Sequence, residues 1–182
     1  DLFSQFHNFA HRQNYRRNKS VISRISVTLE EVLTGKTVDA EIAVPGNKKK
    51  IVELNIPAGV ENGQQVKFKG MGDSSIEGVP AGDLIIHISV AMHDRFERNG
   101  PNLIYKQSVP AWDAMLGTEL IVQKLDQHEI KVKVKPGTQP GTVLRCGAEG
   151  LPKVNSQSRG DLYIVISVDI PTELTDEEKI VI

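Results

Sequence analysis

The chain has 182 residues, of which 39% are hydrophobic and 25% are charged, and its formal net charge is −1. These proportions are those of a soluble globular protein, so they exclude wholesale disorder, and the net charge argues against a surface built entirely for nucleic acid. The single cysteine, Cys146, excludes an internal disulfide framework and a CxxC-type zinc site, and it fits a reducing compartment. No apolar run approaches the roughly 20 residues that a membrane-spanning helix needs.

The first 20 residues, DLFSQFHNFAHRQNYRRNKS, match nothing later in the chain. We expect them to be the end of an upstream linker. Basic side chains are concentrated between positions 12 and 24, and Asp1 is the only acidic residue in the first 24 positions of the sequence. Such cations can contact phosphates without reading a sequence, although a solvated, charged tail is the simpler interpretation.

Residues 21–92 are predicted to form a β-rich domain. Thr28 and Glu31 have the spacing of a capping box ahead of Val32 and Leu33, which predicts one short helix. The segments VELNIP (52–57) and LIIHISV (84–90) have the period of two that is typical of half-buried strands. Glycines between these runs indicate turns.

Residues 101–170 repeat this pattern. The string GDLIIHISV at 82–90 returns as GDLYIVISV at 160–168, an offset of 78. Upstream the offset becomes 82, where Ser26-Val27-Thr28 meets Ser108-Val109-Pro110. Self-similarity of this kind indicates an internal duplication, and hence two similar β-rich domains at 21–92 and 101–170. The glycines that pair at the offset of 78 are Gly59, Gly63, Gly72 and Gly82 with Gly137, Gly141, Gly150 and Gly160.

The duplication provides a control in the search for chemistry, because a structural residue should have a like or apolar counterpart in the other copy. Cys146 pairs with Phe68, which predicts a core side chain rather than a nucleophile. Asp83 and Asp161 recur at the same turn, which suits capping of backbone N–H groups better than acid–base catalysis. No histidine, cysteine and carboxylate set has metal-ligand spacing. We therefore predict no enzyme, no metal and no cofactor.

An ordered series of motifs over about 21–180 resembles the two carboxy-terminal substrate-binding domains of DnaJ-type J-domain co-chaperones. The resemblance implies a mainly all-β fold of two tandem β-sandwich-like domains with short helices. It also implies that 171–182 begin a dimerisation helix, which Thr175 and Glu178 would cap, so the full-length protein would be a homodimer. PGNKKK at 45–50 stands where type A members carry a zinc-binding insertion, so the chain is similar to type B. The motifs are SVTLEEVLTGKT (26–37), NIPAGVENGQQVKFKGMGD (55–73), NLIYKQSVPAWDAMLGTEL (102–120), PGTQPGTVLR (136–145) and the two copies of the GDL strand.

The resemblance implies a cytoplasmic co-chaperone that binds unfolded or non-native polypeptides and delivers them to a seventy-kilodalton heat-shock chaperone. In type B relatives such segments bind an apolar groove on the first domain, where an added strand uses the unpaired backbone groups of a sheet edge. The second domain has Ala111 opposite Leu29, so its groove should be poorer. By position, the implied peptide-binding residues are Val27, Leu29, Ala40, Ile42, Ile88 and Phe96.

Two further binding activities are considered. In relatives, lysines near the groove receive the acidic tail of the partner chaperone. The alternative function is non-specific binding of curved DNA, as in some type B relatives, through the basic stretch 12–24. The lysines near the groove that could contact an acidic tail or phosphates are Lys48, Lys49, Lys50, Lys67 and Lys69.

Overall fold

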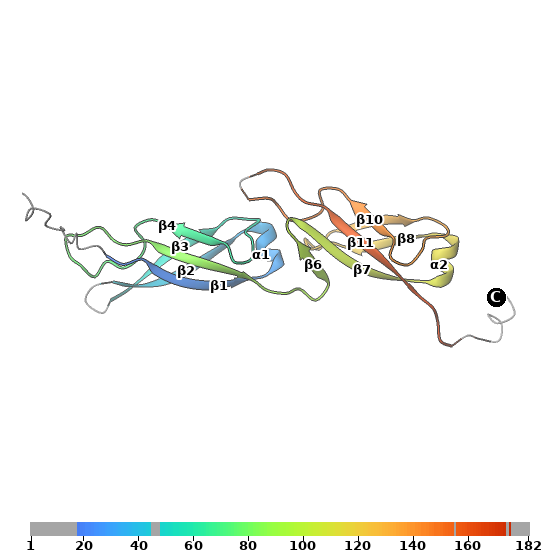
Figure 1. Cartoon of the computed structure of the whole chain (residues 1–182), viewed down its shortest axis with the longest axis horizontal. Coiled ribbons are helices and arrows are strands. Elements are labelled where there is room, and N and C mark those ends of the chain that lie inside the picture. The colour runs from blue at the N-terminus through green and yellow to red at the C-terminus, as the bar shows by residue number, and fades with distance from the viewer. Residues whose placement is uncertain (1–17, 45–47, 155, 174, 176–182) are drawn as a thin grey trace, which may run out of the picture. The chain divides into compact units, whose positions relative to one another are not determined.

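The computed structural model of the chain describes residues 18–44, 48–154, 156–173 and 175. These residues form mostly strands and two helices of six residues each, so the prediction of a mainly all-β fold is confirmed (Figure 1). Most of the predicted linker at 1–20 and of the predicted C-terminal helix lies outside the described residues. In chain order the elements are β1 (Val21–Val27), α1 (Leu29–Thr34), β2 (Lys36–Val44), β3 (Lys48–Ile56), β4 (Gln65–Phe68), β5 (Leu84–Val90), β6 (Phe96–Asn99), β7 (Asn102–Pro110), α2 (Ala111–Leu116), β8 (Thr118–Gln123), β9 (Glu129–Val134), β10 (Val143–Cys146) and β11 (Leu162–Asp169).

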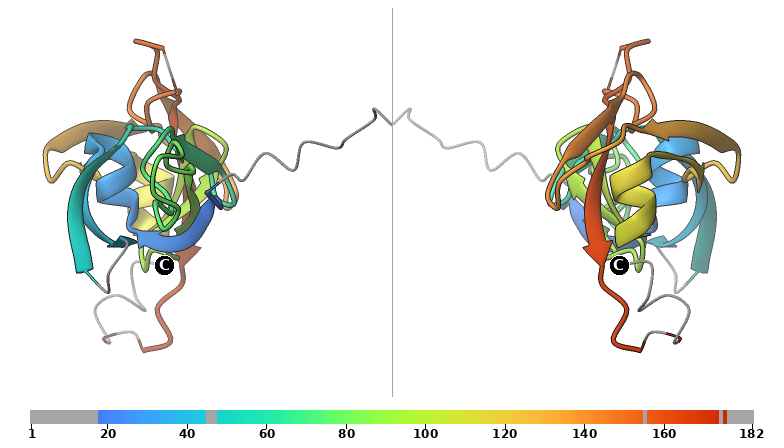
Figure 2. Two further views of the ribbon diagram at one scale, coloured as in Figure 1. Left: turned by 90° about the vertical axis from the view of Figure 1, so that its left-hand side faces the viewer. Right: turned by 90° about the vertical axis from the view of Figure 1, so that its right-hand side faces the viewer.

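The strands pair into four sheets. Their strand orders are β1-β5-β4, β10-β11-β7-β6, β2-β3 and β8-β9. Strand β11 runs parallel to β7, from Leu162 opposite Leu103 to Asp169 opposite Pro110, whereas β6 pairs with β7 as an antiparallel hairpin. Because α2 follows Pro110 directly, it lies beside the end of β11 (Figure 2).

The duplication extends to individual backbone pairs. Val66 lies opposite Ile86 in the β4–β5 pair, and Leu144 lies opposite Ile164 in the β10–β11 pair. The N–H of Gly63 donates to the carbonyl of Ile88 at 2.8 Å, and the N–H of its counterpart Gly141 donates to the carbonyl of Ile166 at 2.7 Å. Gly63 and Gly141 therefore form equivalent turns beside the two equivalent strand pairs.

The two helices occupy equivalent places in the copies but begin differently. In α1 the Thr28 N–H donates to Oε2 of Glu31 at 2.9 Å, and the Glu31 N–H donates to Oγ1 of Thr28 at 3.3 Å, which confirms the predicted capping box. Helix α2 starts after Pro110, which makes no side-chain capping bond. Both helices end at a glycine with a φ of 83°, a conformation that a side chain disfavours.

Burial follows the predicted alternation along the GDL strands. Three alternate residues in each of β5 and β11 are at most 2% exposed, whereas the residues between them and Val90 and Val168 at the strand ends are half-buried or exposed. Strands with this period place one face against the core. The buried residues are Leu84, Ile86 and Ile88 in β5, and Leu162, Ile164 and Ile166 in β11.

Backbone contacts divide the chain into two compact units. Unit 1 comprises Asp1–Arg24, Asp39–Leu54 and Gln65–His87, and unit 2 comprises Ile25–Val38, Asn55–Gln64 and Ile88–Ile182. These units follow contacts in space rather than the sequence repeat. The domain boundaries at 21–92 and 101–170 stay a prediction.

Candidate functional site

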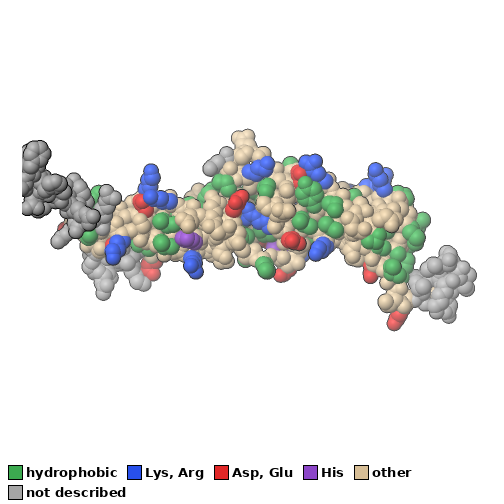
Figure 3. All heavy atoms as spheres, viewed as in Figure 1, with side chains coloured by type: hydrophobic (Ala, Val, Ile, Leu, Met, Phe, Trp, Pro, Cys, Tyr) green, Lys and Arg blue, Asp and Glu red, His purple; other side chains and the backbone are tan. Residues whose placement is uncertain are grey.

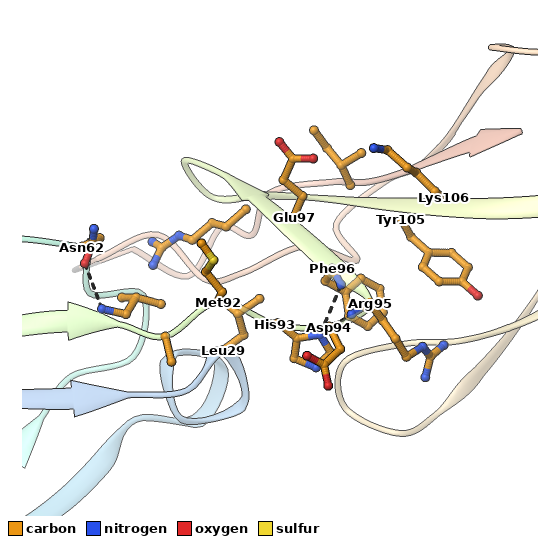
Figure 4. A pocket seen from close by; sticks show the side chains of 14 residues that line it. Leu29, Asn62, Met92, His93, Asp94, Arg95, Phe96, Glu97, Tyr105 and Lys106 are labelled. Carbon is orange, nitrogen blue, oxygen red and sulfur yellow. Dashed lines mark hydrogen bonds between the residues drawn. The ribbon is translucent and has the colours of Figure 1, made fainter. Parts of the chain in front are cut away.

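Unit 2 contains a pocket of about 870 Å³ (Figure 4). Four segments line it: the start of α1, the turn before β4, the stretch from the end of β5 through β6, and the middle of β7. About half of the lining residues are apolar or aromatic and the rest are polar or charged, and the volume of the pocket lies in the range of ligand-binding pockets. The lining residues are Leu29, Asn62, Val90–Arg98 and Ile104–Lys106.

Two buried side chains and one exposed side chain give the pocket its apolar character. Leu29 is 2% exposed and Phe96 is 4% exposed, whereas Met92 is 98% exposed. The Phe96 ring packs against Tyr105, with ring centroids 5.4 Å apart, because the β6–β7 register sets these two residues opposite each other. A solvent-exposed methionine beside a buried leucine and phenylalanine leaves apolar surface open to a ligand.

The two arginines of the pocket are bound within the protein. The Arg95 guanidinium lies 5.4 Å from the centroid of Phe96 and 5.3 Å from that of Tyr105, and it donates to Oε1 and to the carbonyl oxygen of Gln123, both at 3.1 Å. Arg98 donates to the carbonyl oxygens of Val60 and Gly100, both at 2.8 Å. Burial lowers the pKa of Arg98, but a guanidinium stays charged at neutral pH. These arginines therefore stiffen the pocket walls.

His93 connects the loop before β6 with helix α1. Its Nδ1 accepts the backbone N–H of Arg95 at 3.0 Å and that of Phe96 at 3.2 Å, and its Nε2 lies 3.1 Å from Oε1 of Glu30. Burial acts to raise the pKa of Glu30, but the hydrogen bonds from its own backbone N–H, Thr28 and His93 outweigh that effect and lower it. Glu30 is therefore a carboxylate at neutral pH, and it can accept a hydrogen bond from His93.

The structure brings together part of the predicted peptide-binding set. Leu29 and Phe96 line the pocket, whereas Val27 and Ile88 are buried at 1% and 2% exposure and do not line it. Ala40 and Ile42 lie in β2, but their side chains are outside the described part of the structure. The peptide-binding role of all six residues stays a prediction.

The predicted lysines do not line the pocket. Lys67 forms an ion pair with Asp83, with Nζ and Oδ2 2.6 Å apart, and Lys69 is exposed. The side chains of the lysines at 48–50 in β3 lie outside the described residues, as does most of the basic stretch 12–24. On the face in Figure 3, basic and acidic side chains of the described residues are interspersed. Binding of DNA or of an acidic tail stays a prediction.

Sequence reasoning missed Met92, Arg95 and Tyr105. The duplication could have indicated Met92, because Met92 and its counterpart Ile170 are both large apolar residues just after the GDL strand. Ile170 is also strongly exposed, at 75%. Two large apolar side chains at equivalent positions just beyond a strand could have indicated an exposed apolar surface. Arg95 and Tyr105 gave no such signal, because their contact depends on the β6–β7 register.

The described residues contain no group of three or more histidine, cysteine and acidic residues that could hold a metal ion. None of their helices is long and apolar enough to cross a membrane. Cys146 is half-buried, and burial, followed by the charge of Glu149, raises the pKa of its thiol, so the unreactive neutral form is favoured.

Comparison with known proteins shows the family to which the chain belongs. The family model of the DnaJ C-terminal domain matches residues 21–171. The chain belongs to the DnaJ C-terminal domain family. The DnaJ chaperone family consists of non-enzymatic co-chaperones, so the prediction that the chain is not an enzyme is confirmed at the level of the family. Its similarity to type B members in particular stays a prediction.

Curated relatives are proteins named "Chaperone protein DnaJ". The one from Syntrophobacter fumaroxidans is 40% identical over 132 residues, which are 72% of this chain and 34% of that protein. The one from Lachnospira eligens is 42% identical over 134 residues, 73% of this chain and 36% of the relative. The one from Clostridium tetani is 42% identical over 132 residues, 72% of this chain and 35% of the relative. The matched segment therefore spans about a third of the length of these relatives.

Proposed function

We propose that this DnaJ C-terminal region binds non-native polypeptides and delivers them to a seventy-kilodalton heat-shock chaperone. The observation that carries the proposal is the apolar part of the pocket in unit 2, where Leu29 and Phe96 are buried in the wall and Met92 is 98% exposed. The relatives that match the chain are named as chaperone proteins, which supports the same conclusion.

The client would be an extended segment with large apolar side chains. Methionine has three rotatable bonds and a polarizable sulfur, so Met92 can adapt to side chains of different shape. An edge strand offers backbone donors and acceptors that any sequence can use. In this proposal Leu29 and Phe96 contact the client, and Val27 and Ile88 support them from the core. Ala40 and Ile42 keep the peptide-binding role that the resemblance implies.

The expected affinity suits a protein that holds a client and then hands it on. Burying an apolar client side chain contributes about 1.5–3 kcal/mol. Association costs at least ~4 kcal/mol in lost freedom, so two or three buried side chains leave binding in the micromolar range or weaker. A homodimer formed through the segment at 171–182 would recover affinity, because two linked sites raise the effective concentration.

The remaining parts of the proposal concern the partner and the compartment. An acidic tail of the partner chaperone would meet Lys69 more readily than Lys67, because Lys67 is already paired with Asp83. The lysines at 48–50 are further candidates for the same contact. We place the protein in the cytoplasm, as the resemblance to DnaJ-type co-chaperones implies.

Fluorescence anisotropy with a labelled, permanently unfolded polypeptide tests the proposal. Met92→Ser should weaken binding about fivefold, because it removes about 1 kcal/mol of apolar burial without touching the core. Ile121→Ser is the matched control, because Ile121 is 62% exposed in β8 and does not line the pocket. No binding by the wild-type chain, or equal losses for the two variants, would contradict the proposal.

A further inference from the structure

The hydrogen bonds of His93 define which ring nitrogen carries the proton. Backbone N–H groups only donate, so Nδ1, which lies 3.0 Å from the Arg95 nitrogen and 3.2 Å from the Phe96 nitrogen, must be an acceptor. A neutral imidazole with an accepting Nδ1 carries its proton on Nε2. That proton points to Oε1 of Glu30, 3.1 Å away. In His93, Nδ1 therefore accepts hydrogen bonds from the loop backbone, and Nε2 donates one to Glu30.

These bonds join the two segments that form the apolar wall of the pocket. The two bonds at Nδ1 fix the backbone where β6 begins, and so set the position of Phe96, whose ring centroid lies 5.3 Å from that of His93. The bond at Nε2 holds the first turn of α1, in which Leu29 precedes Glu30. Figure 4 shows His93 between Leu29 and Phe96, with dashed lines from its ring to the backbone of the loop.

The second copy shows that the fold does not need this pair. At the offset of 82 Glu30 corresponds to Trp112, and at the offset of 78 His93 corresponds to Pro171. Helix α2 nevertheless has the same length as α1, ends at a glycine with the same φ, and precedes the same strand pairing. A residue required by the fold alone would recur. The contact between Glu30 and His93 therefore serves a role that is specific to the first copy.

We propose that His93 is the positioning residue for peptide binding in the pocket. Through Nδ1 the ring holds the backbone that carries Phe96, and through Nε2 it holds the helix turn that carries Leu29, so it keeps these two side chains in place for the client. Glu30 orients the ring through its contact with Nε2. This inference rests on the proposed function, because it assigns to His93 a part in the binding of non-native polypeptide.

Two side chains of similar polarity separate the roles of the ring nitrogens. His93→Asn places an amide oxygen near the position of Nδ1, so it can still accept from the Arg95 and Phe96 N–H groups while it loses Glu30. His93→Gln reaches toward the position of Nε2 and keeps a donor for Glu30, but it leaves the two N–H groups without their acceptor. His93→Ala loses both kinds of bond.

Amide hydrogen exchange and peptide anisotropy on the full 182-residue chain distinguish these variants. His93→Asn should keep slow exchange at Arg95 and Phe96 and should bind the labelled unfolded polypeptide within about twofold of wild type. His93→Gln and His93→Ala should lose that protection and bind about fivefold to tenfold more weakly, the effect of one or two lost hydrogen bonds. Circular dichroism would verify that each variant is folded.

The outcomes separate this inference from the proposed function. If wild type binds the polypeptide and His93→Gln and His93→Ala bind it equally well, the inference is wrong and the proposed function stands. If wild type binds no polypeptide, the proposed function fails and takes the binding role of His93 with it. The ¹⁵N chemical shifts of the His93 ring in wild type need no variant: a proton on Nε2 supports the geometry, and a proton on Nδ1 overturns it.

Discussion

Replacing Ala148 by glycine is expected to stabilise the protein. Ala148 has a φ of 58°, in the left-handed region, where a side chain costs about 1–2 kcal/mol. The same turn in the first copy has Gly70, with a φ of 68°. Part of the gain from removing the side chain is offset, because glycine gives the unfolded chain more conformational freedom, which lowers the stability by ~0.4–1 kcal/mol. The free energy of unfolding should therefore rise by about 0.5–1 kcal/mol.

The reciprocal change and a matched control complete the test. Gly70→Ala should destabilise by a similar amount, because a Cβ there meets no atom within 4 Å and only the positive φ opposes it. Gly147→Ala is the control, because its φ lies outside the left-handed region and its Cβ would approach only Oδ1 of Asp161, at 4.0 Å. It should be neutral or slightly stabilising.

Differential scanning calorimetry can resolve these differences. For a chain of this size, 1 kcal/mol shifts Tm by roughly 2–4 °C, so Ala148→Gly should raise Tm by about 1–4 °C. If Ala148→Gly lowered Tm, or if Gly70→Ala raised it, the claim that both copies have the same turn conformation would be refuted. An increase for Gly147→Ala as large as that for Ala148→Gly would also count against the backbone argument.

Two further predictions concern the carboxylates and the close backbone approach of the repeated turn. The hydrogen bond from Lys67 lowers the pKa of Asp83, and the Ala148 N–H, followed by Arg145, lowers the pKa of Asp161. Because both pKa values are lower in the folded chain, the unfolded chain binds protons at these two carboxylates more readily. The two ionised carboxylates therefore stabilise the fold fully above a pH of about 4, and this stabilisation is lost as the pH falls below that value. Urea unfolding across this range should show a smaller loss in the Asp83→Asn/Asp161→Asn variant than in wild type; equal losses would contradict the assignment. Gly160→Ala should lower the free energy of unfolding by about 1–3 kcal/mol, because its Cβ would collide with the carbonyl oxygen of Pro101, and an unchanged urea midpoint would refute that contact.

The sequence predicted the strands and turns of the repeat because short-range rules determine them. Glycines with positive φ, such as Gly63 and Gly141, set each register, and the period of two along the GDL strands placed their apolar residues on one face. Periodicity does not reveal what covers that face. The 2% exposure of Ile88 follows from packing between segments, which no local pattern encodes.

The pocket was harder to predict for the same reason. Arg95, Phe96 and Tyr105 meet only after β6 and β7 pair, and His93 reaches Glu30 across 63 positions of sequence. The resemblance to DnaJ-type domains supplied Leu29 and Phe96, but it did not supply the exposed Met92. A comparison of the two copies, which differ at Glu30 and His93, would have been the most informative additional signal.

Site-specific photo-crosslinking tests the central claim most directly. A benzophenone amino acid would replace Met92 in one sample and Ile121 in another, since both side chains are strongly exposed and only Met92 lines the pocket. With a labelled unfolded polypeptide, position 92 should form crosslinks that excess unlabelled polypeptide suppresses, and position 121 should form few. Equal crosslinking from the two positions, or none from position 92, would contradict client binding in this pocket.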